Sequence, residues 1–441
     1  MANILLFGAG KSASYLIRYF LEKAPENSYT LHVCDPVADQ LRIHHQSKAL
    51  ICHAFGIENK SSCMALIQKA DIVISLLPPF LHIQVAEMCL EAGKNLVTAS
   101  YTDEAMKKLH PEVLKKGLCF LNEAGLDPGI DHMSAMKLIH EIHNQGGEIL
   151  GFESFTGGLV APENDTNPWN YKLSWNPRNV VLAGYGSSAR YIDNSELHFV
   201  SYPQLFQRTQ TFSHPSYGDF EGYPNRDSLL YKDWYQLQGI QTLLRGTLRR
   251  PGYCSGWNVM VQLGLTDDSY LMDLPPGCSG RQFLNSFLPW HPSLHVEEKL
   301  AQIPALGWNL ELEEKFRFLG LLSSDYALPK LKGSPAEILQ AILEEKWKLE
   351  DADRDLIVMI HRIKYKLNGE IRHIESSMAL EGEDARYTAM AKTVGLPAAI
   401  CAEAILNEKF SQKGVCIPVH PELYLPALKQ LDELGISFIE R

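Results

Sequence analysis

The sequence predicts an α/β protein: a doubly wound parallel sheet at the N-terminus, followed by an α+β domain with a mixed sheet and a helical insertion. Three observations predict it. Short apolar runs alternate with amphipathic stretches up to about residue 144, as in parallel strands that helices bury on both faces. A glycine-rich motif follows the first apolar run. From about Glu148, short alternating segments with hairpin turns replace this pattern, which indicates a second class of domain.

The composition excludes several classes of protein. The chain has 441 residues, enough for two or three domains, and a net charge of −11, which argues against nucleic acid or a membrane as partner. We expect no secretory signal and no membrane span, because no basic start precedes the first apolar residues and the apolar runs are short. The nine scattered cysteines and the spacing of His140 and His143 indicate reduced thiols and no metal site. We expect a cytoplasmic protein.

The first predicted strand, residues 4–7, runs into a Gly-x-Gly-x-x-Ala motif and then a helix over residues 11–23. Gly8 permits a tight turn, Gly10 lets a pyrophosphate approach the backbone, and Ala13 permits close helix–strand packing. The phosphates would meet the free N–H groups at the start of the helix. This order predicts a Rossmann-type dinucleotide site.

An acidic residue follows the second predicted strand, residues 30–34. Asp35 lies 22 residues after Ala13, where an acid is expected to bond the adenosine ribose. A carboxylate would repel a 2′-phosphate, so Asp35 favours NAD, while Arg42 nearby leaves NADP possible. The alternative is a loop acid before Pro36.

The alternation continues to residue 144, with strands at residues 71–76, 95–98 and 118–121 and helices at residues 80–92, 103–116 and 133–144. Three strand ends, residues 75–78, 98–101 and 122–131, are therefore expected to line one edge of the sheet, beside the nicotinamide. Residues 122–132 contain Asp127 and Asp131. Turn chemistry in Asp127-Pro128-Gly129 and an N-cap at Asp131 are the structural alternatives to ligand binding.

The second half shows hairpin signals around Asp193-Asn194-Ser195 and Asn368-Gly369. A charged helical pattern lies between them, with a helix that opens at Ser334-Pro335. Residues 386–407 are rich in small side chains and predict a closely packed helix, and the chain ends with a helix and a strand at residues 436–439 that suggest a return to the first domain. The expected domains are residues 1–130 with 385–441 (dinucleotide-binding), 131–278 with 354–384 (substrate and dimerisation), and 279–353 (helical insertion).

Two arginine-containing segments lie in this half, residues 223–228 and 245–250. Guanidinium groups suit bidentate binding of carboxylates. A surface arginine, or an internal pair with Asp227, is the structural alternative.

Together these segments resemble the saccharopine dehydrogenase (glutamate-forming) family, also called saccharopine reductases, over nearly the whole chain. The resemblance is carried by residues 8–13, 75–78, 98–101, 122–132, 157–159, 172–178, 223–228, 245–249 and 388–397. It implies a three-domain protein, often a homodimer. It also implies the reaction saccharopine + NAD(P)⁺ + water ⇌ glutamate + 2-aminoadipate 6-semialdehyde + NAD(P)H, in lysine metabolism.

The resemblance also implies site residues. Asp127 would bind the substrate nitrogen, and Tyr101 would relay a proton or orient the substrate, so these two are the catalytic candidates. The substrate positions are Ser100, Tyr101, Asp127, Arg226, Thr247, Leu248 and Arg249. The cofactor positions are Gly8, Gly10, Lys11, Ser12, Ala13, Asp35, Leu76, Leu77, Thr98, Ala99, Ser100, Leu126, Asp127, Pro128, Gly129, Asp131, Trp175, Asn176, Pro177 and Arg178.

The sequence departs from the family pattern at two positions. Members that use NADP look to have arginine where this chain has Asp35, so it resembles the NAD-using members. Thr156 stands where some relatives have a cysteine discussed as catalytic, so a mechanism that needs this thiol fails here. Two other functions stay open: a related amine or imine reductase, such as a carboxynorspermidine-forming enzyme, and a non-catalytic NAD-binding protein.

Overall fold

The computed structural model describes residues 2–441, which form two compact units. Unit 1 consists of the chain up to Glu148 together with Leu367–Gly369 and Met378–Ile439. Unit 2 consists of Ile149–Lys366, Glu370–Ser377 and Glu440–Arg441. Each unit is discontinuous in sequence. The expected division into three domains, with its boundaries, stays a prediction.

Unit 1 contains a seven-stranded sheet with the order β17-β6-β5-β4-β1-β2-β3, in which all neighbours are parallel. The strand order reverses at β1, which is where an open parallel sheet binds its ligand. Residues Ile4 to Phe7 of β1 are at most 1% exposed, as expected of a strand covered on both faces. The predicted Rossmann-type sheet is confirmed. Its strands are β1 (Ala2–Phe7), β2 (Tyr29–Cys34), β3 (Leu50–His53), β4 (Ile72–Ser75), β5 (Leu96–Thr98), β6 (Cys119–Leu121) and β17 (Gly414–Cys416).

The helices of unit 1 alternate with these strands up to β6. Its α-helices are α1 (Ser14–Asn27), α2 (Leu41–His44), α3 (Lys60–Lys69), α4 (His82–Ala92), α5 (Glu104–Lys108), α6 (His110–Lys115), α7 (Ile130–Asn144), α14 (Ala389–Leu406) and α15 (Pro421–Glu433). Its 3₁₀ helices are η1 (Lys11–Ala13), η2 (Ala38–Gln40) and η3 (Pro79–Leu81).

Some elements of unit 1 differ from the expected pattern. The helix expected over residues 103–116 is two helices: the Asp103 side chain caps α5, and α6 begins at His110 with Pro111 in its first turn. Proline has no N–H to continue the hydrogen bonds of α5. The pattern does not indicate β3, because it is a four-residue edge strand whose Ile51 is 38% exposed, without the continuous apolar run of a central strand.

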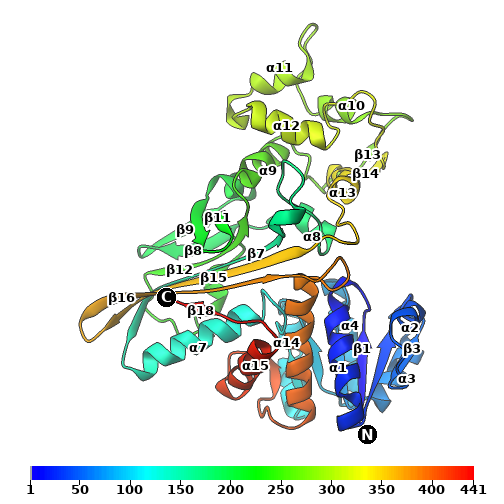
Figure 1. Ribbon diagram of the computed structural model, residues 1–441, viewed down its shortest axis with the longest axis vertical. Helices are drawn as coiled ribbons and strands as arrows, with labels where there is room; N and C mark the ends of the chain where they lie inside the picture. The colour runs from blue at the N-terminus through cyan, green and yellow to red at the C-terminus, as the bar shows by residue number, and fades with distance from the viewer. Residues whose placement is uncertain (1) are drawn as a thin grey trace. The chain divides into compact units, whose positions relative to one another are not determined.

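Helix α14 runs beside α1 within unit 1 (Figure 1). The Thr388 side chain caps it by accepting a hydrogen bond from the N–H of Ala391. A Cβ at Gly395 would lie 3.0 Å from Ser12 O and from Leu16 N, so glycine permits the close packing that the sequence predicts. Of the helices in the described chain, α14 has the length and apolar composition of a membrane span, but 67% of it is buried inside the protein, as in a core helix.

Unit 2 contains a nine-stranded mixed sheet, as predicted. Its order is β10-β11-β12-β7-β15-β16-β18, with β8 beside β12 and β9 beside β8. Strands β7 and β12 are parallel, whereas β11–β12 and β8–β9 are antiparallel. The predicted hairpin turns form at Asn194 and Asn368, both of which have positive φ. The strands are β7 (Glu148–Val160), β8 (Ala189–Asp193), β9 (Glu196–Val200), β10 (Gln210–His214), β11 (Gly218–Pro224), β12 (Thr242–Arg249), β15 (Asp355–Leu367), β16 (Glu370–Glu381) and β18 (Ile439–Glu440).

The end of the chain corrects one expectation. The strand expected over residues 436–439 does not join the first sheet: β18 lies beside β16, where Glu375 and Arg441 exchange backbone hydrogen bonds of 3.0 and 2.9 Å. The chain returns to the parallel sheet through β17 instead, which pairs with β6.

The core of unit 2 is aromatic. Trp169, Trp257 and Trp347 are at most 1% exposed, and their ring centroids lie 5.3–6.3 Å apart. Burying one such ring contributes about 4–6 kcal/mol of transfer free energy. In the region of the expected insertion, Ser334 and Glu337 form the capping box of α13. The helices of unit 2 are η4 (Pro162–Asn164), α8 (Pro177–Val181), η5 (Tyr202–Gln207), η6 (Ser228–Tyr231), α9 (Tyr253–Gln262), α10 (Gly280–Asn285), α11 (Val296–Ala301), η7 (Pro304–Leu306), α12 (Leu310–Phe318) and α13 (Pro335–Lys346), with a small hairpin of β13 (Met272–Asp273) and β14 (Lys332–Gly333).

Candidate active site

The glycine-rich loop follows β1 at the point where the strand order reverses. Gly8 has φ of +96°, and a Cβ there would lie 3.0 Å from the Leu76 carbonyl group, so the fold itself requires glycine. Gly10 differs: its φ is −70°, and a Cβ would meet no atom of the described chain within 4 Å. The open space beside Gly10 fits an approaching phosphate. Ala13 is 1% exposed and its N–H donates to Gly10 O at 3.0 Å, which closes the turn into α1.

Asp35 lies at the end of β2, next to this loop. Its Oδ2 accepts a hydrogen bond of 2.9 Å from the N–H of Ala9, and its Oδ1 accepts one of 2.9 Å from the N–H of Val37. These two bonds hold the carboxylate beside the Gly-x-Gly turn. The arrangement fits a dinucleotide, with Asp35 positioned for the ribose.

Hydrogen bonds connect the ends of β4 and β5. The His82 Nδ1 lies 2.9 Å from Ser75 Oγ, and its Nε2 lies 2.8 Å from Ser100 Oγ. Burial lowers the pKa of His82 to about 4, although Asp103 opposes this shift. Thr98, 1% exposed, donates to Asn122 Oδ1 at 3.1 Å. Ser100 and Thr98 thus lie at the carboxyl edge of the sheet, as expected, while Leu76, Leu77 and Ala99 are half-buried there.

The loop before α7 brings the two catalytic candidates together. The Tyr101 hydroxyl donates to Asp127 Oδ1 at 2.9 Å, and Asp127 is half-buried. The Asp127–Pro128 peptide bond is cis. Leu126 is 5% exposed. A Cβ on Gly129 would lie 2.0 Å from Gly125 O, so this close approach requires glycine.

The N-cap expected at Asp131 is wrong. The N-cap of α7 is Gly129, and Asp131 lies within the first turn, where its Oδ1 accepts a hydrogen bond from the N–H of Gly129. Asp131 is 1% exposed. Its carboxylate therefore stabilises the turn, and its expected place among the cofactor residues stays a prediction.

A buried contact between Glu123 and His132 supports the same loop. Glu123 has φ of +58° and is 4% exposed; its Oε2 lies 2.8 Å from His132 Nε2, and its Oε1 accepts from the N–H of Thr102 at 2.9 Å. Burial alone raises the pKa of Glu123, but the hydrogen bond and charge of His132 lower it to about 2. The ionised Glu123 holds the start of the loop to the residues after β5.

In unit 2, one face of the sheet carries polar side chains. Alternation along β12 places Thr247 and Arg249 on one face and Leu248 on the other. Thr247 pairs in register with Thr156 of β7 and with Tyr223 of β11. Leu248 is 0% exposed, and a Cβ on Gly157 would lie 2.9 Å from its Cβ. The side chain of Leu248 thus packs in the core. Its backbone carbonyl makes the polar contact with the predicted site, by accepting a hydrogen bond from Arg249 Nη1 at 2.9 Å.

Arg249 is a buried cation. It is 3% exposed, and its guanidinium lies 5.1 Å from the Tyr171 ring centroid, 5.2 Å from that of Tyr253 and 6.0 Å from that of Tyr223. No carboxylate of residues 2–441 forms a salt bridge with it, and its Nε has no hydrogen-bond partner there. Burial raises the pKa of Tyr223 and of Tyr253, so these phenols are neutral. A buried guanidinium without a counter-ion is costly unless an anionic ligand satisfies it.

The remaining predicted residues of unit 2 have structural contacts. Arg226 is exposed with φ of +51°. Asp227 forms its ion pair with Arg190. The ion pair of Asp227 with Arg226, which the sequence offered as the structural alternative, does not form. Arg178 pairs with Asp268. In the same segment, Asn176 caps α8, Pro177 is its first residue, and the Trp175 Nε1 donates to Tyr171 OH at 3.2 Å.

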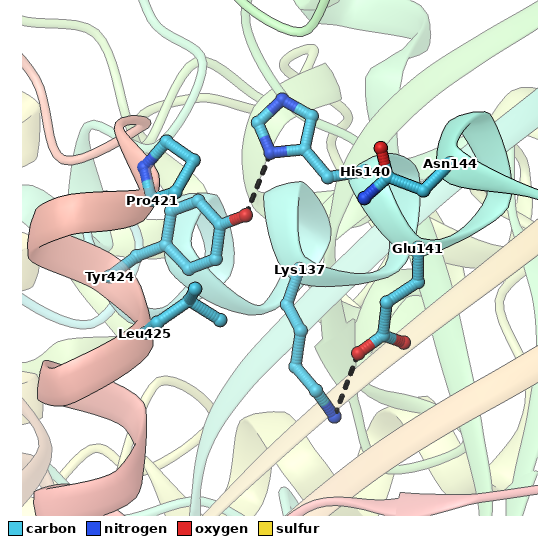
Figure 2. A pocket seen from close by; sticks show the side chains of 7 residues that line it. All are labelled: Lys137, His140, Glu141, Asn144, Pro421, Tyr424 and Leu425. Atoms are coloured by element: carbon cyan, nitrogen blue, oxygen red, sulfur yellow. Dashed lines mark hydrogen bonds and ion pairs between the residues drawn. The ribbon is translucent and has the colours of Figure 1, made fainter.

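A separate cavity of about 360 Å³ lies between α7 and α15 in unit 1 (Figure 2). The Tyr424 hydroxyl lies 2.7 Å from His140 Nδ1, and Lys137 lies 3.9 Å from Glu141. No predicted site residue lines it. The lining residues are Lys137, His140, Glu141, Asn144, Pro421, Tyr424 and Leu425.

Sequence reasoning missed His82, Glu123 and Ser154, and it noted Thr156 only as a departure from the family pattern. His82 lies within the expected 80–92 helix, where a lone histidine gives no signal. Glu123 lies in the segment of residues 122–132, where Asp127 and Asp131 are the more prominent acids. Ser154 and Thr156 lie on β7, and both hydroxyls are buried without a hydrogen-bond partner in the described part of the chain. Two small polar residues on either side of Phe155, which places them on one face of a strand, are the signal that could have found this pair.

Comparison with known proteins gives full-length matches. The family model of the saccharopine dehydrogenase NADP binding domain matches residues 4–121, and that of the saccharopine dehydrogenase C-terminal domain matches residues 125–436. The saccharopine dehydrogenase (NADP(+), L-glutamate-forming) of Saccharomyces cerevisiae is 32% identical over 100% of this chain and 99% of its own. The mitochondrial alpha-aminoadipic semialdehyde synthase of Mus musculus is 35% identical over 99% of this chain and 47% of its own.

A solved structure matches equally well. The apo histidine-tagged saccharopine dehydrogenase (L-Glu forming) from Saccharomyces cerevisiae has a TM-score of 0.87 at 32% identity, covering 100% of this chain and 99% of that chain. The likeness therefore extends over both units, each with the fold described above.

Proposed function

Because the chain belongs to the saccharopine dehydrogenase family, a family of oxidoreductases with a nicotinamide dinucleotide cofactor, we propose that it acts on the CH–NH group of saccharopine. It interconverts saccharopine with L-glutamate and 2-aminoadipate 6-semialdehyde in lysine metabolism. The observation that carries this proposal is the full-length match to a glutamate-forming enzyme. The family match makes the chain an oxidoreductase; the substrate and the bond cleaved are the proposal.

The chemistry needs a group that receives a proton from the secondary amine, because only a neutral amine expels hydride readily. A nicotinamide dinucleotide held at the Gly8–Ala13 loop beside Asp35 would supply the hydride acceptor. Asp127 binds the substrate nitrogen and receives the amine proton. Tyr101, which donates to Asp127 at 2.9 Å, orients this carboxylate. Water then adds to the substrate imine, and the carbinolamine breaks its C–N bond to release glutamate and the semialdehyde. Proton transfer of this kind contributes roughly 10²–10⁴-fold.

The polar face of unit 2 supports recognition of an anionic substrate. Arg249 is buried without a carboxylate partner among residues 2–441, and the buried hydroxyls of Ser154 and Thr156 lack partners there too. A substrate carboxylate on Arg249 satisfies the guanidinium, and Arg226 binds a second carboxylate. Fixing both carboxylates orients the reacting carbon, which is an effective-concentration gain. Thr156 has no thiol, so acid–base steps fall to Asp127 and Tyr101.

We propose NAD as the preferred cofactor. The yeast relative and the matching family model carry NADP in their names, whereas the carboxylate of Asp35 is held beside the Gly-x-Gly turn by the N–H of Ala9. There it bonds the ribose hydroxyls and repels a 2′-phosphate. Direct titration with both cofactors decides between these two arguments.

The proposal also covers the domain organisation, the oligomeric state and the cellular location of the protein. The three-domain division given above, a homodimer and a cytoplasmic site of action follow from the family resemblance and the composition. Sedimentation of the purified protein tests the dimer, and fractionation of cells tests the location.

The function is tested with purified protein, saccharopine, and NAD or NADP. We expect saccharopine-dependent formation of reduced nicotinamide, with glutamate and the semialdehyde as products. Turnover of a carboxynorspermidine-type amine but not of saccharopine would establish the alternative reductase. Tight binding of the reduced dinucleotide without turnover of either substrate would identify a non-catalytic protein. The presence of Arg226 and Arg249 favours saccharopine, which carries more carboxylates than the polyamine.

A further inference from the structure

His82 bridges two hydroxyls that belong to different strand ends of unit 1. Ser75 is the last residue of β4, His82 is the first residue of α4, and Ser100 follows the end of β5 by two residues. The imidazole spans them with hydrogen bonds of 2.9 Å at Nδ1 and 2.8 Å at Nε2. Ser75 and His82 are 0% and 5% exposed, so solvent does not compete for these bonds.

Hydrogen bonds at both ring nitrogens leave the His82 imidazole little freedom to rotate. Burial lowers the pKa of His82 to about 4, with Asp103 the charged group acting against this shift, so the ring is neutral at physiological pH. A neutral imidazole has one N–H donor and one acceptor nitrogen. It therefore donates to one serine and accepts from the other, and the direction taken at Ser75 dictates the direction at Ser100.

We propose that His82 is a positioning residue that fixes the hydroxyl of Ser100 for the substrate and the dinucleotide at the carboxyl edge of the sheet. The inference rests on the function proposed above. Ser100 is also tied to the catalytic loop, because its carbonyl accepts the N–H of Glu123 at 3.1 Å. The residue after it, Tyr101, donates to Asp127. A change in the position of Ser100 therefore also changes the positions of Glu123 and of Tyr101, which contacts the proposed proton acceptor Asp127.

Two substitutions separate the two bonds of the imidazole. The side-chain amide of His82→Gln extends to the place of Nε2 and can still bond Ser100. The shorter amide of His82→Asn lies near the place of Nδ1 and retains the bond to Ser75 alone. If His82 acts through Ser100, kcat/KM falls on the order of 10- to 100-fold in the Asn variant and by much less in the Gln variant. Equal losses in the two variants would overturn the inference.

A double-mutant comparison tests whether the effect passes through Ser100. The double variant His82→Asn with Ser100→Ala is expected to be no less active than Ser100→Ala alone. Multiplied losses would show that His82 acts elsewhere and would contradict the proposal. The matched control is His140→Gln, because His140 also bonds a hydroxyl, that of Tyr424 (Figure 2), but at the cavity away from Ser100's strand end; it is expected to keep wild-type kcat/KM.

A readout without turnover keeps this inference separate from the proposed function. In protein labelled with ¹⁵N-histidine, the His82 resonances are assigned by their loss in His82→Gln. Ser100→Ala is expected to move the Nε2 resonance and Ser75→Ala the Nδ1 resonance. If wild-type protein turns over no saccharopine, the proposed function fails, and the same variants are compared by affinity for reduced dinucleotide. An Nε2 resonance unchanged by Ser100→Ala overturns the bridge itself.

Discussion

The hydroxyl of Tyr101 donates to Oδ1 of Asp127 across 2.9 Å. The tyrosine follows β5 and the aspartate precedes α7, so two successive strand ends of the parallel sheet meet in this contact. A phenol that donates to a carboxylate fixes the orientation of that carboxylate. This relationship distinguishes Asp127 from Asp131, whose carboxylate bonds the backbone of its own turn.

Asp127→Asn is expected to lower kcat by about 10²-fold or more, because the amide cannot take the proton of the amine. Fold and dinucleotide affinity are expected to stay, since asparagine still accepts from Tyr101. Steady-state kinetics and fluorescence titration with reduced dinucleotide measure the two. The control is Asp325→Asn, at an exposed aspartate of unit 2. Near-wild-type turnover of Asp127→Asn would remove Asp127 from the chemistry.

Arg249→Met removes a buried charge and roughly keeps its volume. Burying a charge without a counter-ion is costly, and replacing even a buried ion pair by apolar side chains of similar volume is often neutral or stabilising by about 1–4 kcal/mol. We expect an unchanged or higher Tm and a loss of kcat/KM for saccharopine of about 100-fold. Thermal unfolding and steady-state kinetics on one preparation test both. Lower Tm with retained kcat/KM would mean that Arg249 serves the fold alone.

Arg226→Ala is expected to raise the KM for saccharopine about 10-fold or more, because a bond between charged groups contributes about 1.5–3 kcal/mol. As Arg226 is exposed, little change in stability is expected. The matched control is Arg372→Ala on β16, where the arginine side chain is 45% exposed and pairs with Glu370. An unchanged KM in Arg226→Ala would assign that residue a surface role.

Asp35 predicts cofactor preference. Wild-type protein is expected to bind NADH about 10-fold or more tightly than NADPH, because a 2′-phosphate would approach the carboxylate. Asp35→Asn keeps an oxygen for the N–H of Ala9 and removes the charge, so it is expected to narrow this difference. Asp39→Asn is the control, since its exposed carboxylate pairs with Arg42 at 3.4 Å. Tighter binding of NADPH by wild-type protein would refute the role given to Asp35.

Glu123 predicts a pH dependence of stability. Its folded pKa of about 2 lies below the ordinary value of 4.5, so the folded state favours the ionised form. The contribution is fully present above pH 4.5 and is lost as the pH falls towards 2; by linkage it amounts to roughly 3 kcal/mol. The free energy of unfolding in urea is expected to fall more steeply between pH 6 and pH 3.5 in wild-type protein than in Glu123→Gln. Parallel pH profiles would contradict the role of the Glu123–His132 pair.

Local sequence signals predicted the parallel sheet well. Three of these signals are local in sequence: the turn glycine Gly8, the buried apolar run of β1, and the acid Asp35. They can therefore be recognised without knowledge of the fold. The hairpin turns at Asn194 and Asn368 are local in the same sense. Short or half-exposed strands, β3 and β17 among them, carry no comparable signal, because their pairing partners rather than their residues decide that they form.

The sequence by itself determined the class of the first domain, the place of the dinucleotide loop and the strand ends where a ligand would lie. Only the tertiary structure decided which side chains meet there: Tyr101 with Asp127, His82 with two serines, and Arg249 with three tyrosines but no carboxylate of the described chain. The physical reason is the distance along the chain over which each kind of interaction acts. Turn and strand preferences act between neighbours in sequence, whereas the partner of a polar side chain is set by strand order and register, which bring distant residues into contact.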